Sequence, residues 1–332
     1  MAEFAIVGAG AIGAYLGARL AVAGFDVTLI ARGPHLEAMR RQGVRVIEAD
    51  GSELVAKPSC TDDLGAANAA DTVFVTLKAH SLPTVAPALG AVLHERSTVV
   101  FAQNGIPWWF FLGQRRLETV DPGGVIAASI PLRQVVGCVV YPATSLVEPG
   151  VVRHLEGSRL SLGEPDGSRS ERVRAIAAAL VRAGLKAPIQ TRLRQEIWLK
   201  LIGNATLNPV SALTRATLGE LLADAATREL IRTLMLEVEA VGKAIGIEPD
   251  LPIERRLEGA AQVGEHRTSM LQDVEAGRPL EVEALVGAVV ELAGQVGIPV
   301  PALDVVYRLT RRLDASVARA RPLEVSQGAG GR

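Results

Sequence analysis

Residues 4–33 read FAIVGAGAIGAYLGARLAVAGFDVTLIARG, and this stretch decides the fold of the first half of the chain. A short apolar run, Phe4–Val7, leads directly into the turn Gly8–Gly13. We expect a helix over Ala14–Ala23 and a second strand over Val27–Ala31, because the apolar residues follow helical and then strand spacing. Strand, glycine-rich turn, helix and strand in this order are typical of a Rossmann-type dinucleotide-binding unit.

The three glycines of the turn have separate physical roles. Gly8 allows the tight turn, Gly10 lets the backbone approach the pyrophosphate, and Gly13 lets the helix pack closely on the sheet. The pyrophosphate then meets the N-terminus of the helix, where free N–H groups and the helix dipole favour an anion. The predicted cofactor-binding turn consists of Gly8, Ala9, Gly10, Ala11, Ile12 and Gly13.

The end of the second strand distinguishes the two nicotinamide cofactors. NAD enzymes usually place an Asp or Glu there to bind the ribose hydroxyls, whereas this chain has Arg32, whose guanidinium suits a 2′-phosphate. Asp26 begins the strand and therefore lies at its other end. A surface arginine without a ligand is the alternative, but the pattern favours NADP(H).

Two further predicted strands end in polar residues. The first runs from Asp71 to Lys78, and the second runs from Thr98 to Asn104. Ligands bind at the carboxyl ends of the strands in an open α/β sheet, so Lys78 and Asn104 are candidate binding residues. A helix cap or an ordinary surface group is the alternative for either residue.

The remaining pattern indicates two domains. Apolar runs at 135–140, 151–155 and 159–162 look like strands, with an antiparallel arrangement at the far edge of the sheet as one option, and 169–183 has helical spacing. Beyond 190 the periodicity is almost wholly helical, over 194–213, 217–222, 226–245, 264–276, 281–296 and 302–312.

We therefore predict an α/β domain followed by an all-α domain. The first is a Rossmann-type dinucleotide-binding domain at residues 1–188, and the second is an all-helical domain at residues 189–321. The last residues, 322–332, are predicted to be a disordered tail.

Composition argues against several classes of function. The 332 residues are 48% hydrophobic and 21% charged, and the net charge of −1 offers no electrostatic footprint for nucleic acid or an anionic membrane. No apolar stretch approaches the roughly 20 residues that span a bilayer, and the N-terminus lacks the basic region of a secretion signal. The two cysteines and five histidines have no metal-ligand spacing, so we expect no metal site and a reduced, cytoplasmic setting.

Residues 196–213, EIWLKLIGNATLNPVSAL, form a largely apolar helical pattern that Lys200, Asn204 and Asn208 interrupt at intervals of four. Four residues advance a helix by about 40° beyond one turn, so these side chains form a single polar stripe. Only five of the 35 basic residues are lysines, which makes each lysine a candidate for proton transfer, a role that arginine cannot fill. Buried amides and an ammonium need partners, which either neighbouring helices or a ligand could supply.

Five motifs occur together in this chain: GAGAIG at 8–13, TLKAHS at 76–81, FAQNG at 101–105, KLIGNATLNP at 200–209 and SMLQDVEAGRPLE at 269–281. In their order and spacing the chain resembles the ketopantoate reductases (2-dehydropantoate 2-reductases). The resemblance implies NADPH-dependent reduction of 2-dehydropantoate, a small 2-oxo acid, to pantoate for pantothenate and coenzyme A synthesis.

The same resemblance implies roles for single residues. Lys200 would donate the proton to the ketone oxygen. The substrate would be bound by Asn104, Asn204, Asn208 and Ser269. The cofactor would be bound by Arg32, Lys78, Asn104 and Glu281, with Ala143 lining the nicotinamide. A homodimer is one option for the assembly.

Some positions depart from the family pattern. Leu218 and His266 stand where some members have asparagines, and Leu280 replaces a common threonine. The segment 106–112, IPWWFFL, follows Asn104 directly and forms either a pocket wall or a packing plug. Two alternatives therefore stay open: a related reductase with a bulkier 2-oxo acid, or a non-catalytic NADP(H)-binding redox sensor, for which nothing requires a lysine in the stripe.

Overall fold

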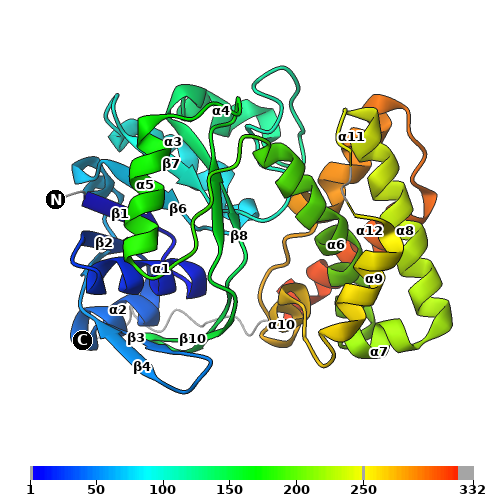
Figure 1. The fold of residues 1–332 in the computed structure, drawn as a ribbon, viewed down its shortest axis with the longest axis horizontal. Helices are drawn as coiled ribbons and strands as arrows, with labels where there is room; N and C mark the ends of the chain where they lie inside the picture. Colours follow the sequence, from blue (N-terminus) through cyan, green and yellow to red (C-terminus); the bar gives the residue numbers. More distant parts are fainter. Residues whose placement is uncertain (1–2, 249–250, 321–332) are drawn as a thin grey trace, which may run out of the picture. The chain divides into compact units, whose positions relative to one another are not determined.

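The computed structural model describes residues 3–248 and 251–320, which fold as two compact units that divide between Trp198 and Leu199 (Figure 1). The division falls inside one long helix, α6 (Leu193–Thr214). The domain boundary expected after residue 188 lies earlier in the chain and stays a prediction. The expected tail at 322–332 lies outside the described residues.

A seven-stranded sheet forms the centre of the first unit, in the order β11-β8-β7-β6-β1-β2-β5. Six of the strands run parallel, and β11 pairs antiparallel with β8. Its strands are β1 (Glu3–Val7), β2 (Asp26–Ile30), β5 (Ser59–Thr61), β6 (Thr72–Val75), β7 (Thr98–Phe101), β8 (Val135–Val140) and β11 (Leu160–Gly163). The central strands are short apolar runs buried along their whole length, as expected for a parallel sheet covered on both faces.

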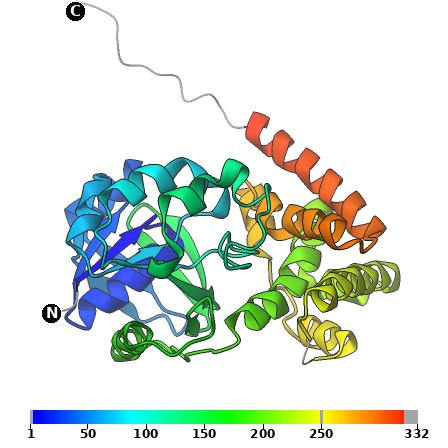
Figure 2. The same ribbon diagram turned by 90° about the horizontal axis from the view of Figure 1, so that it is seen from above.

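Helices cover the two faces of this sheet. The dark-blue α1 (Ala11–Val22) and the green α5 (Glu171–Arg182) lie on one face, and α3 (Leu82–Val92) lies on the other (Figure 2). This arrangement follows from right-handed crossovers, because β1 leads to β2 in one direction along the sheet and β6 leads to β7 in the other. The shorter helices of this unit are α2 (Gly33–Gln42), α4 (Val125–Ser129), η1 (Leu64–Ala69), η2 (Ala79–Ser81), η3 (Pro122–Gly124) and η4 (Leu132–Gln134).

A second, four-stranded sheet was not expected from the sequence. Its order is β4-β3-β10-β9, with β3 (Val44–Ile47), β4 (Glu53–Ala56), β9 (Ala143–Glu148) and β10 (Val151–Glu156). It contacts α1 through all four strands, so α1 packs between the two sheets. The antiparallel option holds for 135–140 and 159–162, which pair antiparallel at the edge of the first sheet, although 135–140 also pairs parallel with β7. It is wrong for 151–155, which belongs to the second sheet.

A half-buried polar cluster joins α1 to the second sheet. Glu48 binds the guanidinium of Arg19 on α1 at 2.7 Å, and its other oxygen lies 2.7 Å from Nδ1 of His154 on β10. The second ring nitrogen of His154 lies 2.5 Å from the Gly157 carbonyl, and because a carbonyl only accepts, that nitrogen carries a proton. The Tyr15 ring stacks on the imidazole with centroids 4.7 Å apart.

The second unit contains only helices among its described residues. They are the rest of α6, α7 (Leu218–Ala223), α8 (Ala225–Ala244), α9 (Ile253–Gln262), α10 (Ser269–Glu275), η5 (Glu283–Gly287), α11 (Ala288–Val296) and α12 (Pro301–Ala320). The sequence did not predict α9, and the helix expected over 281–296 contains a π-turn at η5. In the part of the chain that the structure describes, no helix is long and apolar enough to cross a membrane.

The aromatic segment after Asn104 lies largely inside the first unit. Trp109 and Phe110 are each 1% exposed, and the ring centroids of Phe110 and Trp198 lie 6.2 Å apart. A Cβ atom on Gly137 of β8 would lie 2.5 Å from the Trp109 ring, so this glycine makes room for the indole. Trp108 and Phe111 are only half-buried. Two of the four aromatic side chains thus form a packing plug.

Trp109→Ala should lower the free energy of unfolding by about 3–5 kcal/mol, because it empties the space against Gly137. Trp108→Ala is the matched control and should cost less, since its ring is half-buried. Chemical denaturation monitored by circular dichroism measures both. Equal losses for the two variants would contradict the assignment of Trp109 as the plug.

Candidate cofactor and substrate site

The carboxyl ends of four adjacent parallel strands bring the predicted cofactor residues of the first unit together. In the order β7-β6-β1-β2, Asn104 follows β7, Lys78 follows β6, the Gly8–Gly13 turn follows β1 and Arg32 follows β2. The connections leave β1 in opposite directions along the sheet, which is the switch point where open α/β sheets bind ligands.

The glycine turn is held by the strands on both sides of it. The N–H groups of Gly8 and Ala9 donate to the Ile30 carbonyl at 3.0 and 3.1 Å. From the other side the Thr76 hydroxyl, just after β6, donates to the Gly8 carbonyl at 2.8 Å. Gly8 has φ of +94°, a backbone conformation that favours glycine. The turn is therefore formed by β1, β2 and β6 together.

Each glycine has the space that its predicted role requires. A Cβ atom on Gly13 would lie 2.5 Å from Thr76 Oγ1 and 2.8 Å from the Gly8 carbonyl, so α1 approaches the sheet too closely for any other residue. A Cβ atom on Gly10 would meet nothing nearer than 3.9 Å, which leaves open space beside the turn. Gly10 is the N-cap of α1, and no side chain of the described residues caps this helix. A pyrophosphate fits this open, uncapped N-terminus.

His35 was not among the residues predicted from the sequence. Its Nδ1 accepts a hydrogen bond from the Gly150 N–H at 2.9 Å. Burial lowers the pKa of His35, and the backbone of Ala9 in the glycine turn opposes that shift. A neutral His35 therefore connects the first turn of α2 to the β9–β10 turn. No local pattern could have found it, because Gly150 lies far along the chain.

The end of β2 carries more charge than Arg32 alone. Arg32 is exposed and caps α2 with an extended backbone. Asp62 follows β5, which pairs with β2, and accepts from the Arg40 guanidinium at 2.9 Å. Its own backbone N–H and then Arg40 lower the pKa of Asp62, and the charge of Arg32 adds to the effect. The Glu37 carboxylate also binds Arg40, at 3.1 Å, so two arginines and two carboxylates lie near the end of β2.

Gln103, next to Asn104, links the ends of β6 and β7. Its side-chain amide donates to the Val75 carbonyl at 2.9 Å and to the Leu77 carbonyl at 3.2 Å. Lys78 and Asn104 are both half-buried, and Gly105 follows with φ of +89°. The structure thus places these two predicted residues on neighbouring, cross-linked loops.

Ala143 lies at the end of the next strand. It is the first residue of β9 and is half-buried, and only Tyr141 and Pro142 separate it from β8. Because β8 pairs parallel with β7, the carboxyl end of β8 lies next to the loop that carries Asn104. Ala143 therefore belongs to the same sheet edge as the other predicted cofactor residues of the first unit.

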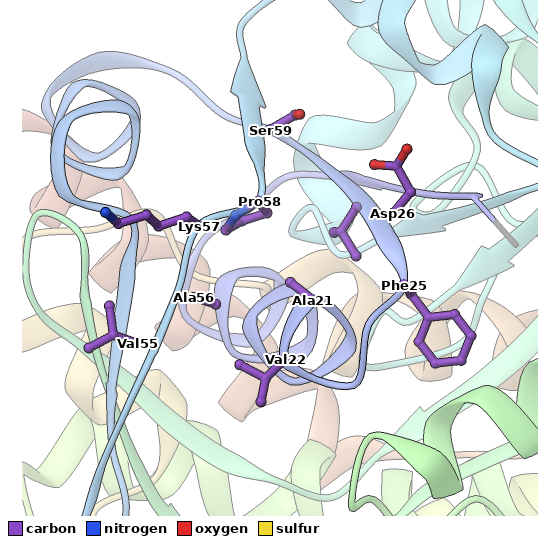
Figure 3. Close-up of a pocket in the computed structure, with 10 residues that line it drawn as sticks. Ala21, Val22, Phe25, Asp26, Val55, Ala56, Lys57, Pro58 and Ser59 are labelled. Atoms are coloured by element: carbon purple, nitrogen blue, oxygen red, sulfur yellow. The ribbon is translucent and has the colours of Figure 1, made fainter. Parts of the chain in front are cut away.

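Two pockets of the first unit lie away from this edge. Figure 3 shows a pocket of about 330 Å³ between α1, β4 and β5, lined by Phe25, Asp26 and Lys57 among others. Asp26 begins β2, whereas Arg32 follows its end, so this pocket opens at the opposite edge of the sheet. A second pocket, of about 510 Å³, lies beside Arg19, Glu48 and His154. Neither pocket includes a predicted site residue.

The polar stripe of the sequence forms on α6. Lys200 and Asn204 are half-buried and Asn208 is 7% exposed, while Leu201, Ile202 and other apolar side chains of the helix are buried. In residues 3–248 and 251–320, no hydrogen bond is formed by the Asn204 or Asn208 side chain. Both amides are therefore available to a polar ligand.

The remaining predicted residues lie on the loops and helix starts of the second unit. Ser269 is the exposed first residue of α10, which the Thr268 hydroxyl caps. Glu281 is half-buried just before η5. Leu218 and His266, the two positions where some family members have asparagines, lie next to each other, because the Leu218 N–H donates to the His266 carbonyl at 3.0 Å. The site residues therefore form two sets, one in each unit.

Family models match most of the chain. Residues 4–167 match the model described as ketopantoate reductase PanE/ApbA, and residues 192–314 match the model described as ketopantoate reductase PanE/ApbA C terminal. A 2-dehydropantoate 2-reductase of Mesorhizobium japonicum is 49% identical over 318 residues, which cover 94% of this chain and 97% of that protein.

Solved structures share the fold. A Ralstonia solanacearum MolK2 protein assigned to the ketopantoate reductases is 42% identical with a TM-score of 0.90, covering 96% of this chain and 99% of its own. A D-mandelate dehydrogenase with NADH and anilino(oxo)acetate is 21% identical with a TM-score of 0.83, covering 95% of this chain and 99% of its own. At that identity the second likeness concerns the fold alone.

Gly10→Ala should abolish tight NADPH binding without lowering stability, because its Cβ enters open space that the pyrophosphate needs. Gly13→Ala should weaken NADPH binding and also lower the free energy of unfolding by about 1–3 kcal/mol, because its Cβ overlaps atoms of the protein. Fluorescence titration with NADPH and thermal melts of the free protein separate the two effects. Wild-type NADPH affinity in Gly10→Ala would contradict this placement of the pyrophosphate.

Proposed function

Because this chain belongs to the ketopantoate reductase family and is an oxidoreductase of that family, we propose that it reduces 2-dehydropantoate to pantoate with NADPH. This reaction would supply pantoate for pantothenate and coenzyme A synthesis. The observation that carries the proposal is the stripe of Lys200, Asn204 and Asn208 on α6, an ammonium beside two amides in a largely apolar helix.

The reaction needs a hydride, a proton and residues that bind the substrate carboxylate. NADPH, when bound, supplies the hydride to the carbonyl carbon. The Lys200 ammonium polarises the ketone oxygen and then transfers its proton to it. Asn204, Asn208 and Ser269 bind the oxo acid, since amides and hydroxyls donate hydrogen bonds to the carboxylate without competing as acids.

Most of the proposed cofactor contacts come from residues at the edge of the first sheet. The Gly8–Gly13 turn binds the pyrophosphate, and Arg32 binds the 2′-phosphate that distinguishes NADPH from NADH. Lys78 and Asn104 contact the cofactor from the β6 and β7 loops, and Ala143 lines the nicotinamide from the end of β8. Glu281 binds the cofactor from the second unit, and Asn104 also contacts the substrate.

A bulkier 2-oxo acid is the second candidate substrate. Trp108 and Phe111 are half-buried on the loop that follows Asn104, unlike Trp109 and Phe110. Leu218 and His266, which replace polar residues of some family members, lie next to each other. The half-buried rings of Trp108 and Phe111, together with Leu218, favour a larger apolar side chain on the substrate. A homodimer and a cytoplasmic location stay predictions.

Lys200→Ala should lower kcat/KM for 2-dehydropantoate by about 10²- to 10⁴-fold, because the alkoxide loses its proton donor. NADPH affinity should survive, because the ammonium acts on the ketone. Steady-state NADPH oxidation and fluorescence titration measure the two quantities. Lys186→Ala, an exposed lysine of the first unit, is the control. Undiminished turnover in Lys200→Ala would refute its role as acid, and a redox sensor would show no turnover in the wild type.

Arg32→Ala should weaken NADPH binding by roughly 10- to 100-fold, the worth of a charge-assisted hydrogen bond to the 2′-phosphate, and leave NADH binding unchanged. Arg41→Ala removes another exposed arginine of α2 and serves as the control. Parallel titrations with the two cofactors give the ratio. A wild-type chain that binds NADH as tightly as NADPH would rule out the phosphate contact.

A further inference from the structure

The polar stripe of α6 begins one turn before Lys200. Glu196 precedes Lys200 by four residues, so Glu196, Lys200, Asn204 and Asn208 recur at one interval along the helix. Side chains four residues apart are neighbours on a helix surface, and Glu placed before Lys at this interval is the favourable order. The residue that adjoins Lys200 along the stripe is therefore an acid.

The Glu196 carboxylate is held by two hydroxyl groups of the first unit. Oε1 accepts a hydrogen bond from the Ser161 hydroxyl at 2.6 Å and another from the Tyr141 hydroxyl at 2.9 Å. Ser161 lies on β11 and is fully buried, and Tyr141 follows the end of β8. We call these three residues the α6 clip, since they fix the first turns of α6 to the edge of the sheet.

The surroundings keep the α6 clip intact. Burial, and then the Glu196 charge, raise the pKa of Tyr141 to about 12, so its hydroxyl stays protonated and donates. The Arg159 guanidinium stacks on the Tyr141 ring at 3.8 Å and lies 3.6 Å from Glu196 Oε1. Two donors thus hold the Glu196 carboxylate, and the stacked Arg159 holds one of them, Tyr141, so neither side chain rotates freely.

Burial of the Glu196 carboxylate costs free energy that apolar side chains in the same place would not. A half-buried carboxylate loses much of its hydration, and apolar residues of similar volume often pack as stably as such polar groups. What the α6 clip provides is a fixed rotation of α6 about its axis, one helical turn before Lys200. Misplacing a reacting group by about 1 Å can cost on the order of 10²-fold in rate.

We propose that Glu196 is a positioning residue, which Tyr141 and Ser161 hold in place so that α6 presents the Lys200 ammonium in a fixed direction. The inference rests on the proposed function, in which Lys200 delivers the proton. Glu196 does not touch the substrate or the cofactor in this account, and it acts only through the helix.

The test compares Glu196→Ala with Glu196→Gln. The Ala variant removes the acceptor of both hydroxyls and should lower kcat by roughly 10- to 100-fold, with the Kd for NADPH unchanged. The Gln variant keeps a carbonyl oxygen for both donors and should restore kcat to near the wild-type value. Glu171→Ala, an exposed acid in the first turn of α5, is the matched control and should leave kcat unchanged.

Two further variants test the donors without altering Glu196. Tyr141→Phe and Ser161→Ala each remove one hydrogen bond and should lower kcat less than Glu196→Ala, and they keep the test valid if Glu196→Ala does not fold. A folded Glu196→Ala with wild-type kcat would overturn the inference. So would equal losses in the Ala and Gln variants, or wild-type kcat in both donor variants.

The activity of the wild type distinguishes failure of the proposed function from failure of the positioning role of Glu196. A wild-type chain that reduces 2-dehydropantoate and loses this activity in Lys200→Ala, but not in Glu196→Ala, overturns the positioning role alone. A wild-type chain that reduces no 2-oxo acid overturns the proposed function and the positioning role together.

Discussion

The close approach of α1 to the ends of β1 and β6 is the constraint on which the rest of the first unit depends. Gly13 lies where a Cβ atom would overlap both the Thr76 hydroxyl and the Gly8 carbonyl, so helix, turn and neighbouring strand share one small volume. This contact aims the uncapped N-terminus of α1 at the open space beside Gly10. It also places α1 between the two sheets, where Arg19 reaches Glu48.

The chemistry divides between two kinds of scaffold. The proposed cofactor residues of the first unit lie on loops at one sheet edge, where parallel pairing sets their order and hydrogen bonds such as those of Gln103 fix their positions. The proposed acid and the two amides lie on a helix, whose periodicity alone sets their alignment. The α6 clip joins these two scaffolds at Glu196, the residue where the stripe starts.

Local pattern predicted the parts of this structure that local physics determines. The glycine turn, the buried parallel strands and the stripe on α6 each arise from residues close in sequence, and the sequence located all of them. The second sheet could not be predicted, because β9 is largely exposed and β10 pairs with β3 across a long stretch of chain. His35 and Glu196 escaped notice for the same reason, since their partners are distant in sequence.

We propose that this chain transfers a hydride from NADPH to a 2-oxo acid and does not merely bind the cofactor. The direct measurement is NADPH oxidation in the presence of 2-dehydropantoate and of larger branched and aromatic 2-oxo acids, with the products identified by mass spectrometry. We expect NADPH to disappear in step with the appearance of pantoate. NADPH binding without consumption of any 2-oxo acid would contradict it.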